Sequence, residues 1–246
     1  MKYFVSIILS ISVFTPIWGQ SSYFAMGASP LVPGRGINLS IPYTSCFLMQ
    51  YGYNGTGSFG FSSEISSVSY GSLTLRRPYS GRGYPHSDAD ISVRSSLLFW
   101  NNSLIYEPYT NEPISPFVEA GIGWAFFTTR WTADNPYHKP TNCDESSIIE
   151  SAIIHHDNVF HVQFGIGSRV RLLHDRESGT SIGLLIGVKW MLGGEVEHLN
   201  PVFNEHHFLD RPLTITSSRF NKDKRPYVAN SRFIAFNLAI YCRFGN

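Results

Sequence analysis

Two groups of polar side chains in this chain could do chemistry. The first is a set of nine histidines, some next to acidic residues, as at His155-His156. Histidine and carboxylate side chains ligate transition metals, but none of the spacings matches a standard metal site. His86-Ser87-Asp88 places the residue types of a hydrolytic triad side by side, yet in a stretch that we expect to be a loop. We therefore predict no metal, no cofactor and no catalysis.

The second group is charged and recurs at every second position of apolar segments. From 160 to 172 one parity is apolar except for Ser168. Successive side chains of a strand point to opposite faces, so this segment predicts a strand with one apolar face and one polar face. The polar parity holds His161, Gln163, Gly165, Gly167, Arg169 and Arg171, and the same alternation recurs at 117–127, 181–195 and 232–244.

The elements that would position these residues are about eight strands. We expect them at 22–32, 37–53, 58–70, 90–105, 115–131, 158–173, 181–196 and 230–244. The clearest of them exceed the usual strand of about 5–6 residues and suit a tilted strand that crosses a bilayer in about 9–11 residues. Short and long gaps alternate after the second strand, with long loops at 71–89, 132–157 and 197–229. A short helix is expected near 147–153.

Two classes of β-barrel differ in the direction that their apolar side chains face. A soluble barrel turns its apolar parity inward, whereas a membrane barrel turns it toward lipid. Glycines such as Gly165 and Gly187 share the charged parity, and small residues suit the crowded interior of an eight-stranded barrel. Aromatic residues gather near both predicted strand ends, as in membrane-interface girdles. The pattern favours an all-β, antiparallel, up-and-down transmembrane barrel.

The first 20 residues are typical of a secretory signal peptide, with Lys2 before the apolar stretch 4–14. We assign 1–20 to this signal and 21–246 to one barrel domain. The whole chain has 19 Lys and Arg against 18 Asp and Glu, and loss of Lys2 leaves 18 of each. This neutrality disfavours nucleic-acid binding. The three cysteines are too few for a disulfide framework.

The segments 114–124 and 236–244 resemble strands of the small outer-membrane β-barrel families of the OmpA-barrel, OmpX and OmpW kind. These are Ile-Ser-Pro-Phe-Val-Glu-Ala-Gly-Ile-Gly-Trp and Phe-Asn-Leu-Ala-Ile-Tyr-Cys-Arg-Phe. The resemblance implies an outer-membrane location in a Gram-negative bacterium. It also implies that Phe244 is a C-terminal signal for the barrel-assembly machinery, although Gly245 and Asn246 follow it here. Outer-membrane lipids and lipopolysaccharide would be partners.

The inward parity predicts a network of charges inside the barrel, and Glu119 is expected at about the depth of Arg169 and Arg171. We favour a salt-bridged interior that closes the barrel, and a structural or surface-interaction role in which the long loops meet an extracellular ligand. A narrow channel for small solutes is the alternative, and a lipid A-modifying enzyme is less favoured. The predicted network comprises Glu64, Arg94, Glu119, Arg169, Arg171, Lys189, Glu195 and Arg243.

Overall fold

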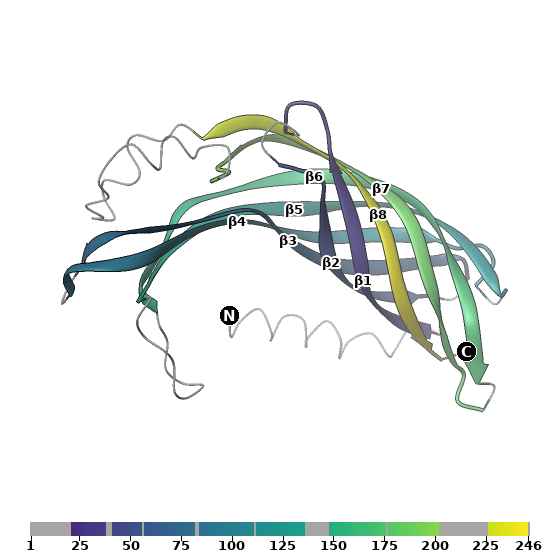
Figure 1. Cartoon of the computed structure of the whole chain (residues 1–246). Helices are drawn as coiled ribbons and strands as arrows, with labels where there is room; N and C mark the ends of the chain where they lie inside the picture. Colours follow the sequence, from purple (N-terminus) through teal and green to yellow (C-terminus); the bar gives the residue numbers. More distant parts are fainter. Residues whose placement is uncertain are drawn as a thin grey trace.

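Eight antiparallel strands close into a barrel in which each strand pairs with the next and β8 pairs with β1 (Figure 1). The computed structural model describes residues 21–37, 41–55, 57–81, 84–110, 112–135, 148–175, 177–201 and 226–245, without the side chains of 77–87 and 149. The expected signal peptide and most of the loop at 197–229 lie outside these residues. The strands are β1 (Ser21–Pro33), β2 (Thr44–Asn54), β3 (Phe59–Gly81), β4 (Tyr84–Tyr106), β5 (Ile114–Asp134), β6 (Ile148–Asp175), β7 (Thr180–His198) and β8 (Tyr227–Phe244). The predicted eight-stranded meander is confirmed.

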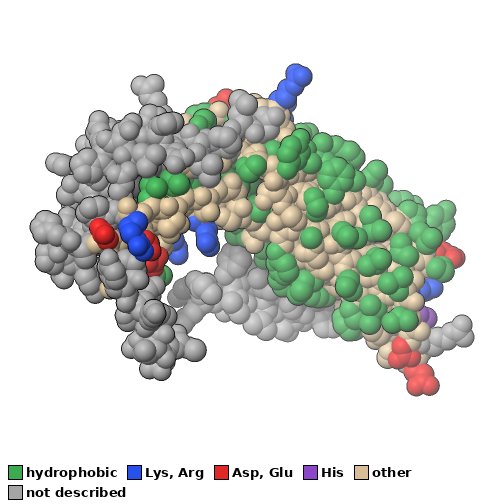
Figure 2. Space-filling model, in the orientation of Figure 1, with side chains coloured by type: hydrophobic (Ala, Val, Ile, Leu, Met, Phe, Trp, Pro, Cys, Tyr) green, Lys and Arg blue, Asp and Glu red, His purple; other side chains and the backbone are tan. Residues whose placement is uncertain are grey.

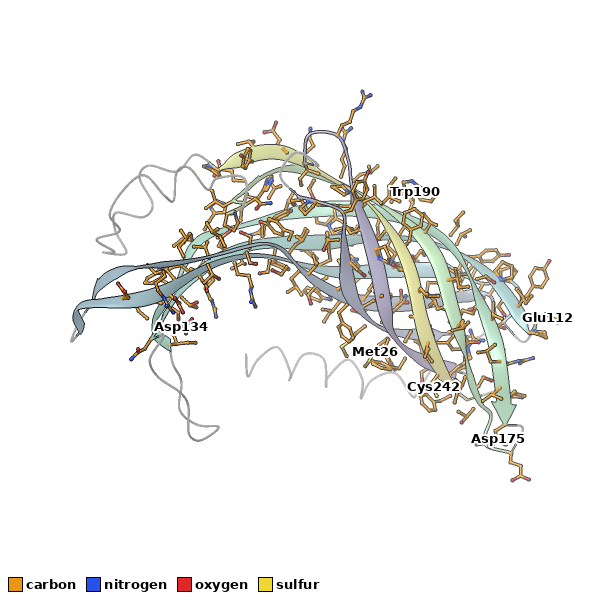
Figure 3. All side chains as sticks on the ribbon, in the orientation of Figure 1. Met26, Glu112, Asp134, Asp175, Trp190 and Cys242 are labelled. Atoms are coloured by element: carbon orange, nitrogen blue, oxygen red, sulfur yellow. The ribbon has the colours of Figure 1, made fainter. Side chains whose placement is uncertain are left out.

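The two ends of the barrel differ. At one end, called the turn end, short connections join β2 to β3, β4 to β5 and β6 to β7. Gly57 and Gly179 have positive φ angles of 109° and 66° in two of these turns, a conformation that glycine adopts without steric cost. β1 begins and β8 finishes at this end too. In Figure 3, Glu112 and Asp175 mark the turn end and Asp134 lies far from it.

At the other end four strands continue past the rest. β2 pairs with β3 only as far as Ser67, while β3 to β6 go on pairing with one another. We call this four-stranded part, residues 68–81, 84–97, 127–134 and 148–157, the extension. β3 and β4 carry it far to the left of the barrel in Figure 1.

The extension corrects two expectations. Residues 71–89 are a continuous part of the β3–β4 hairpin, where Leu73 pairs with Val93, and are not a long loop. A register shift near Ser69 reverses the alternation and hides this continuation. The expected loop at 132–157, with its short helix near 147–153, is strand at both ends: β5 runs to Asp134 and β6 begins at Ile148, and Ala152 pairs with Trp131. β-Branched isoleucines in this stretch favour the strand.

Large apolar side chains cover the outside of the barrel on all eight strands, mainly between the turn end and the extension. We call them the apolar belt. In Figure 2 the hydrophobic side chains gather over the barrel, whereas charged ones gather at its two ends. The belt comprises Phe24, Met26, Phe47, Met49, Phe59, Phe61, Leu98, Leu104, Tyr106, Ile114, Val118, Ile122, Phe160, Val162, Phe164, Ile166, Leu172, Ile182, Ile186, Trp190, Leu192, Phe236, Leu238, Ile240 and Phe244. No helix among the described residues is long and apolar enough to cross a bilayer.

Candidate functional site

The first polar group inside the barrel is a lysine held between two glutamates. Lys189 Nζ lies 2.7 Å from Glu64 Oε2 and 3.0 Å from Glu119 Oε1. The three side chains come from β3, β5 and β7, and all are at least 95% buried. We call them the lysine cluster. An ion pair so far from water must satisfy most of its hydrogen-bonding groups internally.

A glycine allows this cluster to form. Glu119 on β5 pairs with Gly165 on β6, which pairs with Lys189 on β7, so the three residues form one row across the sheet. A Cβ on Gly165 would lie 2.5 Å from Glu119 Oε1 and 2.7 Å from its Cγ. The absent side chain leaves the space through which the glutamate reaches the lysine.

Neutral polar groups complete the hydrogen bonds of Glu64. Asn101 Nδ2 donates to Oε1 at 3.0 Å, and Asn237 Nδ2 approaches Oε2 at 3.4 Å. Ser29 donates to Asn237 Oδ1 at 2.7 Å, and His161 Nε2 lies 2.8 Å from Asn101 Oδ1. These contacts link five strands through one carboxylate.

The second polar group lies nearer the turn end, where Glu107 meets two arginines. Its carboxylate accepts hydrogen bonds from Arg169 Nη1 and from Arg243 Nη2, the latter at 2.9 and 3.0 Å. Asn54 Nδ2 donates to the same carboxylate at 3.1 Å. We call Glu107, Arg169 and Arg243 the arginine cluster. Glu107 is absent from the predicted network because we placed it in a turn, yet it continues the inward parity of β4.

Aromatic rings separate the two clusters. The guanidinium carbon of Arg169 lies 4.0 Å from the ring centroid of Tyr23 and 5.1 Å from that of Phe117. Such cation–π contacts stabilise a buried guanidinium. Both rings belong to a turn-side apolar cluster of Tyr23, Ala25, Leu48, Ile105, Phe117, Leu185, Ala239 and Tyr241.

The interior is therefore layered along the barrel axis. Beyond the lysine cluster lies an extension-side apolar cluster built around Phe99, Phe127 and Phe233, with Ile37 and Ile41 from the β1–β2 connection. The inward side chains of β8 pass through all four layers in order: Arg243, then Tyr241 and Ala239, then Asn237, then Ala235 and Phe233. Polar and apolar layers alternate across the lumen.

The charges of the two clusters balance only when they are taken together. The lysine cluster has two carboxylates and one ammonium group, whereas the arginine cluster has one carboxylate and two guanidinium groups. With all six groups ionised, the first carries one excess negative charge and the second one excess positive charge. Each excess lies in a low-dielectric interior, where removal of a partner is costly.

The structure brings together most, but not all, of the predicted network. Glu64, Glu119, Arg169, Lys189 and Arg243 point inward, but Glu119 pairs with Lys189 and not with Arg169. Arg171 is half-buried at the turn end. Phe244 lies on the outer surface beside Ser22, at the end of the belt.

Two members of the predicted network are exposed, and their placement inside was wrong. Arg94 lies on the outer face of β4, because Val93 and Ser95 on either side of it point inward. Glu195 follows a register shift between Leu192 and Glu195, which turns Val196 inward in its place.

A polar cavity of about 730 Å³ opens at the turn end of the barrel. Asn54, Arg171, Tyr241 and Arg243 contribute to its walls. Asn54 and Arg243 both bond Glu107, so the arginine cluster forms the inner limit of this cavity. The cavity therefore ends at the first closed layer of the interior.

No protein-family model and no curated protein sequence matches this chain. Several solved structures do match it. Ail, the attachment invasion locus protein of Yersinia pestis, is 11% identical over 92% of this chain and 99% of its own, with a TM-score of 0.40 in its complex with the heparin analogue sucrose octasulfate. Neisserial surface protein A is 13% identical over 92% of this chain and 97% of its own, with a TM-score of 0.37. The N-terminal β-barrel domain of Pseudomonas aeruginosa OprF is 10% identical over 92% of this chain and 99% of its own, also with a TM-score of 0.37.

The outer face of the extension is polar. Thr74 and Ser92 share a hydrogen bond of 3.0 Å, and Arg76 Nε lies 2.9 Å from Asp90 Oδ1. The hydrogen bond from Arg76 lowers the pKa of Asp90 below its ordinary value of 3.8. The inner face is apolar and packs around Trp131, Ile91 and Val93. Among the described residues, no three histidine, cysteine or acidic side chains are grouped so that they could hold a metal ion.

Proposed function

We propose that this protein is an integral outer-membrane barrel, closed to solutes, that displays its extension outside the cell for interactions at the surface. The apolar belt carries this proposal. A soluble protein rarely exposes a contiguous apolar patch of more than a few hundred Å², and here the exposed apolar side chains surround all eight strands. Meanwhile the ion pairs of the lysine and arginine clusters lie inside the barrel, the reverse of a soluble barrel.

The height of the belt matches a bilayer. On β7 the belt runs from Ile182 to Leu192, both exposed. These ten residue steps span about 33 Å along the strand and about 25 Å along the barrel axis at a tilt of about 40°. The apolar band of outer-membrane barrels is about 25 Å tall.

The connections suggest the orientation. In bacterial outer-membrane barrels, short turns face the periplasm and longer segments face the exterior. The turn end would then be periplasmic and the extension extracellular. Export would depend on residues 1–20 as a cleaved signal peptide, and insertion on recognition of β8 and Phe244 by the barrel-assembly machinery.

The layered interior favours a surface role over transport. A channel needs a continuous aqueous path, whereas two ion-pair clusters and two apolar clusters alternate across this lumen. A paired strand extension offers a large rigid surface beyond the membrane, to which an extracellular ligand could bind. We propose no catalytic activity.

Site-directed labelling tests the orientation. In a background with all three cysteines replaced by serine, Ser92→Cys would place a thiol on the outer face of the extension, and Ser178→Cys would place one in the β6–β7 turn. We expect a membrane-impermeant maleimide to label Ser92→Cys on intact cells and Ser178→Cys only after the outer membrane is permeabilised. The opposite pattern would refute the orientation.

Shortening the extension tests the surface role. Replacing residues 74–92 with an Asn-Gly turn joins Leu73 to its register partner Val93, so it removes much of the β3–β4 hairpin and leaves the belt residues in place. We expect normal outer-membrane levels and a normal heat-dependent gel shift, but reduced attachment of cells to one another or to surfaces. Unchanged attachment at equal protein levels would argue against this role.

A further inference from the structure

Two arginines face each other on the outer surface of the extension. Arg94 on β4 pairs directly with Arg130 on β5, and both side chains are exposed. Directly opposed residues on one face of a sheet have Cβ atoms about 4.5–5.5 Å apart, and like charges in such positions destabilise the pairing. The fold therefore places two positive charges together at a cost.

No described acidic side chain compensates this pair. Neither arginine takes part in an ion pair among the described residues. The nearest acidic residues on the same face of β4 and β5 are Asp90 and Asp134, each four residues away, or about 13 Å along the strand. Asp90 is already bound by Arg76. The pair is thus open to an external anion.

Hydroxyl groups border the arginines on both sides. Ser96 and Thr128 form the adjacent outward row toward the belt, and Ser92 and Thr132 form the row on the far side. Ser72 pairs with Arg94 from β3. Arginine forks together with hydroxyl donors are a chemistry that suits a phosphate group.

The depth of the pair suggests where that phosphate comes from. Leu98 is the belt residue on β4 nearest to the extension, and Arg94 lies four residues further toward the extension. The arginine pair is therefore about 10 Å beyond the belt along the barrel axis, at a strand tilt of about 40°. The headgroup region begins where the hydrocarbon core ends, and arginine side chains can lean back toward it. The pair also occupies the same outward face as the belt.

We propose that Arg94 and Arg130 form a clamp for a phosphate group of a phosphorylated glycolipid in the outer leaflet. This inference rests on the proposed membrane orientation and adds a specific lipid site to it. The two guanidinium groups would bind the phosphate together, and the exposed hydroxyl group of Ser72, which lies beside Arg94 on β3, would donate a further hydrogen bond. Binding would also relieve the repulsion between the arginines.

The test compares lipid binding by the full mature barrel and its variants. Refolded protein would be titrated with bisphosphorylated lipid A and with the same lipid after removal of both phosphates, and complexes counted by native mass spectrometry. The test variant is Arg94→Gln with Arg130→Gln. The control is Arg232→Gln, which removes an exposed arginine from β8 that faces no second arginine across the sheet.

We expect the wild type to prefer the phosphorylated lipid, and the double variant to lose about tenfold or more of that affinity, because both charge-assisted hydrogen-bond donors to the phosphate are removed. Arg94→Lys with Arg130→Lys should retain part of it, and Arg232→Gln should change it less than about twofold. Equal binding of both lipids, or equal loss in the control, would overturn the clamp.

Two further readouts separate the possible failures. Insertion into phosphatidylcholine vesicles, followed by the heat-dependent gel shift, tests the membrane barrel alone and should be the same for every variant. Soluble polyphosphate, added to protein in phosphatidylcholine nanodiscs, tests the other source of phosphate. Tighter binding of polyphosphate than of lipid A through the same arginines would overturn the lipid assignment and favour a soluble polyanion.

Discussion

Removal of the Glu107 carboxylate should strongly destabilise the barrel. It is the one carboxylate within reach of Arg169 and Arg243 among the described residues, and its side chain is 1% exposed. Glu107→Gln preserves the shape but leaves two guanidinium groups without a counter-charge, and one of them, on Arg169, is fully buried.

The magnitude follows from the contacts that are lost. A hydrogen bond to a charged group contributes about 1.5–3 kcal/mol, and Glu107 has such bonds to two arginines. Breaking a buried ion pair from one side costs about 3–5 kcal/mol. We therefore expect Glu107→Gln to lower the free energy of unfolding by about 3–5 kcal/mol.

The assay is urea unfolding of the refolded protein in phosphatidylcholine vesicles, followed by tryptophan fluorescence and by gel shift. Glu112→Gln is the matched control, because Glu112 is an exposed glutamate in the same turn, and it should change the free energy of unfolding by less than about 0.5 kcal/mol. Arg243→Gln should restore part of the stability of Glu107→Gln, because it removes one of the unpaired charges. If Glu107→Gln unfolds like its control, the arginine cluster does not stabilise the barrel.

Three further outcomes are expected. Gly165→Ala should destabilise the barrel by about 1–3 kcal/mol by displacing Glu119 in the same unfolding assay, whereas Gly194→Ala, whose Cβ would meet its nearest neighbour at 3.7 Å, should not. Arg76→Gln should raise the pKa of Asp90 toward 3.8 in a carboxylate NMR titration, and an unchanged titration would contradict the hydrogen bond between the two side chains. Because the pKa of Asp90 is depressed in the folded protein, the stabilisation from this pair is present above pH 3.8 and is lost as the pH falls through the lowered pKa. Expression of the protein should leave the mass of lipid A unchanged, and a new lipid A species would indicate an enzyme.

The strands and most of the inward-facing residues could be predicted from the sequence, because alternation with a period of two is a local signal. Alternation between 160 and 172 specifies β6, its apolar outside and its charged inside without reference to any other strand. The same reasoning misplaced Arg94, because β4 bears apolar residues such as Leu97 and Leu98 on both parities. It misplaced Glu195 because a shift in register reverses the alternation before it.

Pairing between strands is the part that local patterns do not encode. Glu119 meets Lys189 and not Arg169, because the register of β5, β6 and β7 aligns Glu119, Gly165 and Lys189 in one row. That register depends on the tilt and closure of the whole barrel. Glu107 was missed for a simpler reason, since the inward parity of β4 runs two residues past the point where we ended the strand.

The central claim is that this is a membrane barrel with a closed interior, and conductance across a planar bilayer tests it most directly. The refolded mature protein should insert, as shown by its heat-dependent gel shift, and should carry no discrete current steps. Stable unitary current steps from the wild-type protein would contradict the closed interior. They would indicate an open path that runs through the lumen past both the arginine cluster and the lysine cluster.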